Sequence, residues 1–282
     1  MFEVLQFEFM KNALMAGLLT SVICGIIGTF VVVNRIAFLA GGIAHAAYGG
    51  IGLAFFLGLP YILGTLGFTL FAALIMAAVT LKAKERADTF IGVLWAGGMG
   101  LGVLLLDLTP GYNVDLMSYL FGSILTVPKS DLWQMLVMCL SVGLIVIFFY
   151  NDFLAMSYDE EFAQLRGVPV KGLYFLLIGM IALSIVMIIR VVGLILVIAL
   201  LTIPPYIAEK HARSLRMMML ISTLLCCMFT MTGLWLSYIF NLTSGATIIM
   251  VAVAAFFISF LVQHLKTKRL HSKAIGDTNL VE

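Results

Sequence analysis

His45 is the ionisable side chain that lies deepest in an apolar stretch of this sequence, within GGIAHAAYGGIG at 41–52. Neutral imidazole is a common metal ligand and suits zinc, iron and copper. Arg35 lies ten residues earlier, and ten helical residues rise about 15 Å, so we expect His45 near the middle of a membrane. A single imidazole binds a metal weakly, as a transport site must if it is to release its ion. The alternative interpretation is a structural histidine that hydrogen-bonds to a neighbouring helix.

Four glycines share the helical face of His45, because they lie at −4, −3, +4 and +7 from it: Gly41, Gly42, Gly49 and Gly52. A face of glycines lets another backbone approach closely. We therefore expect this face to pack against protein and to direct His45 into protein or a cavity rather than into lipid.

Cys24 is a candidate second metal ligand. It lies about as far before the turn at Asn34 and Arg35 as His45 lies after that turn, so the two would share a depth if both segments are helical. The commoner role of such a residue is a small buried thiol that packs as an apolar group. The four cysteines form no CxxC pair and indicate no disulfide framework.

The composition is that of a membrane protein: 63% of the 282 residues are hydrophobic and 11% are charged, whereas about a quarter are charged in a soluble domain. Because a span needs about 20 apolar residues, we predict an all-α polytopic bundle of about nine spans, with eight or ten as alternatives. A shorter segment, 114–125, is expected to be re-entrant or interfacial. The predicted spans are 11–33, 42–59, 61–81, 89–106, 131–150, 173–189, 191–208, 217–240 and 246–265.

Basic residues indicate the orientation of the spans. With the C-terminus inside, only Lys11, Lys129 and Arg190 of the 16 basic residues fall outside, and short cytoplasmic loops carry the excess of Lys and Arg. We expect a multi-pass cell-membrane protein with residues 1–265 as the membrane domain, 151–172 as a cytoplasmic loop and 266–282 as a cytoplasmic tail. A tight turn at Arg190 would divide the long apolar run 173–208.

The acidic residues disfavour two other classes of function. All 14 fall in loops, termini or span ends, whereas ion-coupled carriers usually work through carboxylates inside the membrane. A membrane-embedded enzyme would need a cluster such as HExxH, and an ATPase would need GxxxxGK[ST]; the sequence has neither. Ion-coupled transport and a structural subunit of a larger complex are the alternatives to a permease powered by a partner.

The loop segment SYDEEFAQLRGVPVKG at 157–172 predicts a short helix. Ser157 can cap it, and the acidic residues 159–161 favour a first turn. Gly167 and Pro169 predict its end. Such a helix on the cytoplasmic side is typical of a docking element, and an ordinary interfacial helix is the alternative.

A resemblance to a known family rests on stretches that run across nearly the whole chain. The sequence resembles permeases of the ATP-binding-cassette family that import zinc, manganese or iron. The stretches are NRIAFLAGGIAHAAYGGIG (34–52), VDLMSYLFGSIL (114–125), MSYDEEFAQLRGV (156–168), VVGLILVIALLTIPPYIA (191–208) and SYIFNLTSGATIIM (237–250).

This resemblance implies a homodimer in the lipid bilayer, two cytoplasmic subunits that bind ATP, and an extracytoplasmic metal-binding protein. It implies no permanently bound cofactor and no nucleic-acid partner; the ion is the cargo. The 157–167 segment would be the coupling helix that contacts the ATPase, through Asp159, Glu160, Ala163 and Gly167.

The sequence departs from the family pattern at two carboxylates. The family places an aspartate four residues before the histidine, where this chain has Gly41, and often another before its PSG turn, where this chain has Asn241. The loss should weaken binding of a divalent ion. Because the remaining ligand is imidazole, we expect zinc first, then manganese and iron.

Asp107 and Asp115 flank LTPGYNV on the expected outer side. They could attract a cation or receive it from the delivery protein. The more ordinary interpretation is that they are charges for solubility or docking.

Overall fold

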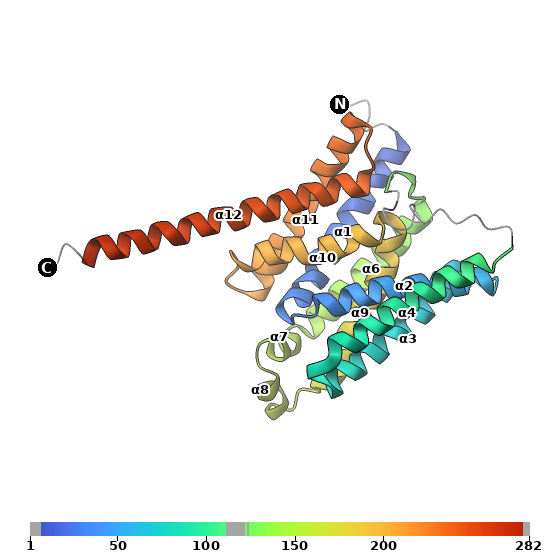
Figure 1. The fold of residues 1–282 in the computed structure, drawn as a ribbon, viewed down its shortest axis with the longest axis horizontal. Coiled ribbons are helices and arrows are strands. Elements are labelled where there is room, and N and C mark those ends of the chain that lie inside the picture. Colours follow the sequence, from blue (N-terminus) through green and yellow to red (C-terminus); the bar gives the residue numbers. More distant parts are fainter. Residues whose placement is uncertain (1–6, 111–121, 123, 279–282) are drawn as a thin grey trace.

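The computed structural model describes residues 7–110, 122 and 124–278, and every regular element in that part of the chain is a helix (Figure 1). Eight of the described helices are long and apolar enough to cross a membrane. They are α1 (Glu8–Val33), α2 (Ala37–Phe56), α3 (Tyr61–Lys82), α4 (Ala87–Asp107), α6 (Lys129–Phe148), α9 (Val170–Val192), α11 (Leu215–Phe240) and α12 (Ser244–Thr278).

Five shorter elements complete the described part of the chain. They are η2 (Lys84–Arg86), η3 (Ile124–Thr126), α7 (Tyr150–Tyr158), α8 (Glu160–Leu165) and α10 (Leu194–Glu209). Most of the 114–125 segment, which the sequence predicts to be re-entrant or interfacial, lies outside the described residues. The helix α12 continues past the expected span end at 265 to Thr278, and Figure 1 shows it extending away from the other helices.

Helix α10 crosses the bundle although it has only 16 residues. It starts just after Arg190, whose Nε lies 3.1 Å from Oδ2 of Asp131, near the start of α6. It ends at Glu209, in a cavity that it shares with Ser157, beyond the other end of α6. The start and end of α10 therefore lie at opposite ends of the bundle. Among the described residues, α10 and the eight long helices together agree with the about nine spans that the sequence predicts.

The turn between α9 and α10 is at Gly193, not at Arg190 as predicted. Gly193 has φ 83°, in the left-handed region that glycine adopts without steric cost. Arg190 is still helical, in the last turn of α9, where a positive charge complements the helix dipole. Its guanidinium pairs with Asp131 and lies 5.6 Å from the ring centroid of Tyr61.

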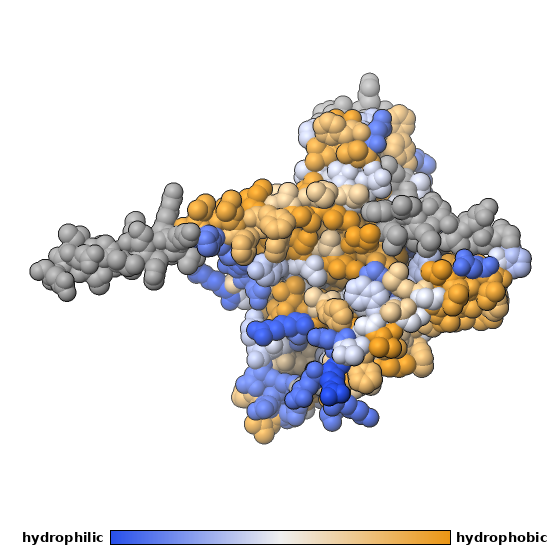
Figure 2. Space-filling model, in the orientation of Figure 1, coloured by the Kyte–Doolittle hydropathy of each residue, from blue (hydrophilic) through white to orange (hydrophobic). Residues whose placement is uncertain are grey.

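Burial divides the helices into a core and a periphery. Helices α1, α2 and α9 are the most buried, whereas no more than 28% of the spanning stretch of α4, α6 or α12 is buried. Figure 1 shows α2, α3 and α4 side by side, and α12 leaving α10 and α11 at the edge of the bundle. Apolar residues cover most of the face in Figure 2, and hydrophilic residues gather mainly at the end where α7 and α8 lie. Such a surface suits a chain surrounded by lipid.

Candidate metal pathway and docking elements

The imidazole of His45 faces helix α4. Its ring stacks on the indole of Trp95, with centroids 4.1 Å apart and an angle of 14° between the planes. Its Nδ1 atom lies 3.1 Å from Sδ of Met99. Trp95 and Met99 are four residues apart and so share one face of α4. The half-buried ring is thus held against protein on one side.

Helix α2 can approach α4 closely because both helices carry glycine where their backbones meet. A Cβ atom added to Gly49 would lie 2.8 Å from the carbonyl oxygen of Gly98, and one added to Gly52 would clash with the backbone of Gly102. A Cβ on Gly42 would lie 2.5 Å from Cγ2 of Ile91. These three glycines therefore lie at the contact between α2 and α4.

Gly41 differs from the other three glycines. A Cβ atom added there would lie 3.6 Å from Cζ3 of Trp95, which is ordinary van der Waals contact. The indole of Trp95, itself 5.7 Å from the ring of Phe38, covers this position. An apolar aromatic ring thus lies next to His45 where the family pattern would place a carboxylate.

Sequence reasoning did not identify Trp95 and Met99 as neighbours of His45. Their four-residue spacing indicates a shared helical face, but it does not say which helix that face contacts. The position of Met99 along its predicted span can be estimated from the sequence. The helix that Met99 faces cannot, because tertiary packing decides which helices become neighbours.

Cys24 is fully buried in α1. Its thiol lies close enough to Cys226 of α11 for an electrostatic interaction, and the next residue, Gly25, contacts Thr223 of α11. His45 contacts α4 instead. Although α1 and α2 are consecutive, they touch each other little. The structure therefore does not bring Cys24 and His45 together, because the two helices pack against different neighbours.

Asp107 is exposed and is the last residue of α4. It follows Met99 by eight residues, or about 12 Å along a helix axis. It lies at the end of the bundle where Arg190 and Asp131 also lie, since its neighbour Leu106 packs in one cluster with Tyr61, whose ring Arg190 covers. Asp115, the second acidic candidate, lies outside the described residues.

Asn241 ends α11 in a left-handed conformation, with φ 51° and ψ 43°. Asparagine tolerates this region better than most residues. Its backbone N–H donates to Ser237, whose hydroxyl in turn donates to the carbonyl of Leu242 at 2.6 Å. In the structure, Asn241 forms the exposed turn between α11 and α12.

Helix α8 is capped by Asp159, not by Ser157 as predicted. The Oδ1 atom of Asp159 accepts a hydrogen bond from the backbone N–H of Phe162 at 2.9 Å. Ser157 is still within α7, and its hydroxyl accepts a hydrogen bond from Nδ2 of Asn34 at 3.0 Å. The extended backbone of Asp159 separates α7 from α8, so the aspartate caps the second helix.

Helix α8 ends at Leu165, two residues before the glycine that the sequence predicts as its stop. Gly167 has φ 79°, and its N–H donates to the carbonyl of Gln164, while the N–H of Val168 donates to Ala163. Ala163 is fully buried, whereas the side chain of Leu165 is 88% exposed. The helix therefore rests on the bundle through a small residue and presents apolar groups outward.

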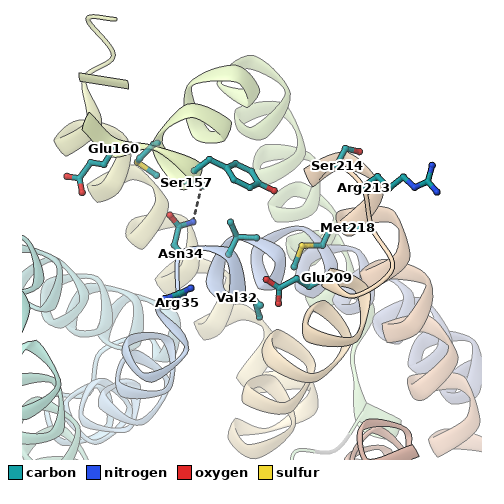
Figure 3. Close-up of a pocket in the computed structure, with 13 residues that line it drawn as sticks. Val32, Asn34, Arg35, Ser157, Glu160, Glu209, Arg213, Ser214 and Met218 are labelled. Carbon is teal, nitrogen blue, oxygen red and sulfur yellow. Dashed lines mark hydrogen bonds between the residues drawn. The ribbon is translucent and has the colours of Figure 1, made fainter. Parts of the chain in front are cut away.

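A cavity of about 630 Å³ separates α8 from the nearby helix ends (Figure 3). Both signs of charge line it: Arg35 follows α1, Glu160 begins α8, and Glu209 and Arg213 lie at the end of α10 and beyond. The hydrogen bond between Asn34 and Ser157 closes one side of it. The turn at Asn34, which precedes α2, is thus hydrogen-bonded to the end of α7, which precedes α8.

These features define a polytopic helical permease, with one half-buried imidazole between two helices and a capped helix presented at one end. The model of the ABC 3 transport family matches residues 6–263. The chain belongs to this family. The predicted resemblance to permeases of metal-importing ATP-binding-cassette transporters is confirmed by this match and by the relatives described next. Members of this class are transport subunits rather than enzymes.

Relatives cover nearly the whole chain. An uncharacterized membrane protein of Synechocystis is 49% identical over 259 residues, which are 92% of each chain. The manganese transport system membrane protein MntC of Listeria monocytogenes is 32% identical over 258 residues, again 92% of each chain. The solved structure of PsaBC from Streptococcus pneumoniae in complex with Fab superposes with a TM-score of 0.85 at 30% identity, covering 95% of this chain and 98% of that chain.

Proposed function

We propose that this chain is the membrane permease of an ATP-driven importer of divalent metal ions. The observation that carries the proposal is the similarity to the manganese transport protein MntC over 92% of both chains. Alternating access would carry the ion inward, with nucleotide-driven closure of the partner ATPase supplying the energy.

The proposed assembly contains a homodimer of this chain in the cell membrane, two cytoplasmic ATP-binding subunits and an extracytoplasmic metal-binding protein. In it, α8 is the coupling helix, with Asp159 as its cap, Glu160 in its first turn, Ala163 against the bundle and Gly167 at its end. The exposed apolar side chain of Leu165 supports this role, because it offers contact area to a partner. The C-terminus would lie in the cytoplasm.

His45 is the proposed ligand on the ion pathway, and zinc is the proposed first cargo, ahead of manganese and iron. Support comes from the donor chemistry. Imidazole suits zinc, whereas manganese prefers carboxylate, carbonyl and water oxygens. The absence of a carboxylate at Gly41 removes the oxygen donor that would favour manganese.

The test is transport by the complete complex. The permease would be co-reconstituted with its ATPase and delivery protein in proteoliposomes, and uptake of zinc and manganese would be followed with and without ATP. The proposal expects ATP-dependent accumulation of zinc. Accumulation driven by an ion gradient without ATP, or no accumulation of any divalent metal, would contradict it.

A further inference from the structure

The two heteroatoms that face each other between α2 and α4 are Nδ1 of His45 and Sδ of Met99, 3.1 Å apart. We propose that Met99 is a second ligand of the transported ion and that the His45–Met99 pair selects zinc over manganese. This inference rests on the proposed function, because it concerns the same pathway.

The separation of the two atoms suits one shared ion. Zinc binds imidazole nitrogen at about 2.0–2.1 Å and cysteine thiolate sulfur at about 2.3 Å, and methionine thioether is a soft sulfur ligand of the same kind. With those bond lengths, a nitrogen–metal–sulfur angle near 90° requires a nitrogen-to-sulfur distance of about 3.1 Å, and a tetrahedral angle requires about 3.6 Å. A rotamer adjustment of the flexible methionine can supply the difference. Without an ion, Nδ1–H can donate to the sulfur; binding needs the tautomer that carries its proton on Nε2.

Trp95 holds the imidazole of the His45–Met99 pair in place and lies next to Gly41. Its stacked indole fixes the plane of the imidazole and covers Gly41. A side chain added at position 41 would therefore begin in van der Waals contact with the indole. His45 and Met99 thus supply one nitrogen and one sulfur donor, where the family pattern would add a charged oxygen.

Among the described residues, no three His, Cys, Asp or Glu side chains come together as a metal site. Two neutral donors, with water in the other positions, hold an ion loosely. Such weak binding is what a conducting site requires, since the ion must leave.

The experiment uses the complete complex with Met99→Leu, which keeps similar volume and removes the sulfur. The matched control is Met228→Leu, at an exposed methionine of α11. The ratio of kcat/KM for zinc to that for manganese should fall at least tenfold in Met99→Leu and stay unchanged in Met228→Leu. X-ray absorption at the zinc edge of the zinc-loaded complex should lose its sulfur shell in Met99→Leu alone.

The outcomes separate this inference from the proposed function. If His45→Ala abolishes uptake while Met99→Leu keeps both the wild-type metal ratio and the sulfur shell, the pathway stands and Met99 is not a ligand. An equal loss of zinc and manganese uptake in Met99→Leu assigns it only a positioning role and also overturns the inference. If His45→Ala leaves uptake intact, the proposed pathway itself is wrong.

Discussion

Arg190 in the last turn of α9 is paired with Asp131 in the first turn of α6, with Nε 3.1 Å from Oδ2. The aspartate side chain is only 8% exposed, whereas the arginine is 40% exposed. The pair therefore joins two helices at the end of the bundle opposite α8. Arg190→Ala should lower the free energy of unfolding by roughly 1–3 kcal/mol, because it leaves a buried carboxylate without a charged partner.

Thermal unfolding of the detergent-purified chain measures this effect. The double variant Arg190→Ala with Asp131→Asn should regain part of the lost stability, because the buried charge is gone. Equal melting temperatures for the wild type and Arg190→Ala would show that the ion pair contributes nothing.

His45→Ala should abolish zinc uptake by the reconstituted complex while leaving assembly with the ATPase normal. The reason is chemical: the substitution removes the one imidazole that lies between α2 and α4. Uptake of radioactive zinc and size-exclusion chromatography of the complex measure the two effects. Wild-type uptake by this variant would mean that His45 is a structural residue.

Gly41→Asp should shift the metal preference from zinc towards manganese. A Cβ atom fits beside Trp95 at 3.6 Å, so the helix should tolerate the change if the indole moves aside. The new carboxylate supplies the oxygen donor that manganese prefers. Competition of manganese against zinc uptake measures the preference, and Gly41→Asn is the matched control without charge. An equal shift in both variants would refute the role of charge.

Asp159→Ala should weaken the interaction with the ATPase. The substitution removes the side chain that caps α8, and loss of such a cap costs about 1 kcal/mol of helix stability. Gly167→Trp should act more strongly, because residue 167 has φ 79° and a bulky side chain there is strained and exposed to the partner. Co-purification of the ATPase measures both effects; wild-type recovery with Gly167→Trp would discard the docking role of α8.

Gly52→Ala should destabilise the chain by about 1–3 kcal/mol, because the added methyl group clashes with the backbone of Gly102. Gly143→Ala in α6 is the matched control, since no atom lies within 4 Å of the added Cβ there. It should be neutral or slightly stabilising, as alanine is the better helix former. Similar melting temperatures for the two variants would argue against close α2–α4 packing.

Much of the fold is predictable from the sequence because apolar length decides which segments cross a membrane. The error at Arg190 has a physical cause. A basic residue suggests a span boundary. Here Arg190 stays within α9 because Asp131, the third residue of α6, pairs with it, and Gly193 makes the turn instead. The error at Ser157 is of the same kind, since Ser157 and Asp159 can both cap a helix and only the backbone conformation decides.

The candidate site was less predictable. The depth of His45 and the glycines beside it follow from helical spacing. Its contacts with Trp95 and Met99 depend on which helices become neighbours, and a single sequence does not encode that in a readable pattern. Cys24 is a second example. Its equal distance from the turn gives its depth in the membrane, but not which neighbouring helix its side chain faces.

The hydrogen bond between Asn34 and Ser157 has a mechanical consequence. Asn34 precedes the first residue of α2 by only three positions, and Ser157 precedes the cap of α8 by two. An α-helix resists compression along its axis, so a displacement at α8 that moves this turn also translates the whole of α2. The imidazole lies eight residues, or about 12 Å, further along that helix. A force applied to α8 would therefore reach the start of the helix that carries His45 through this one hydrogen bond.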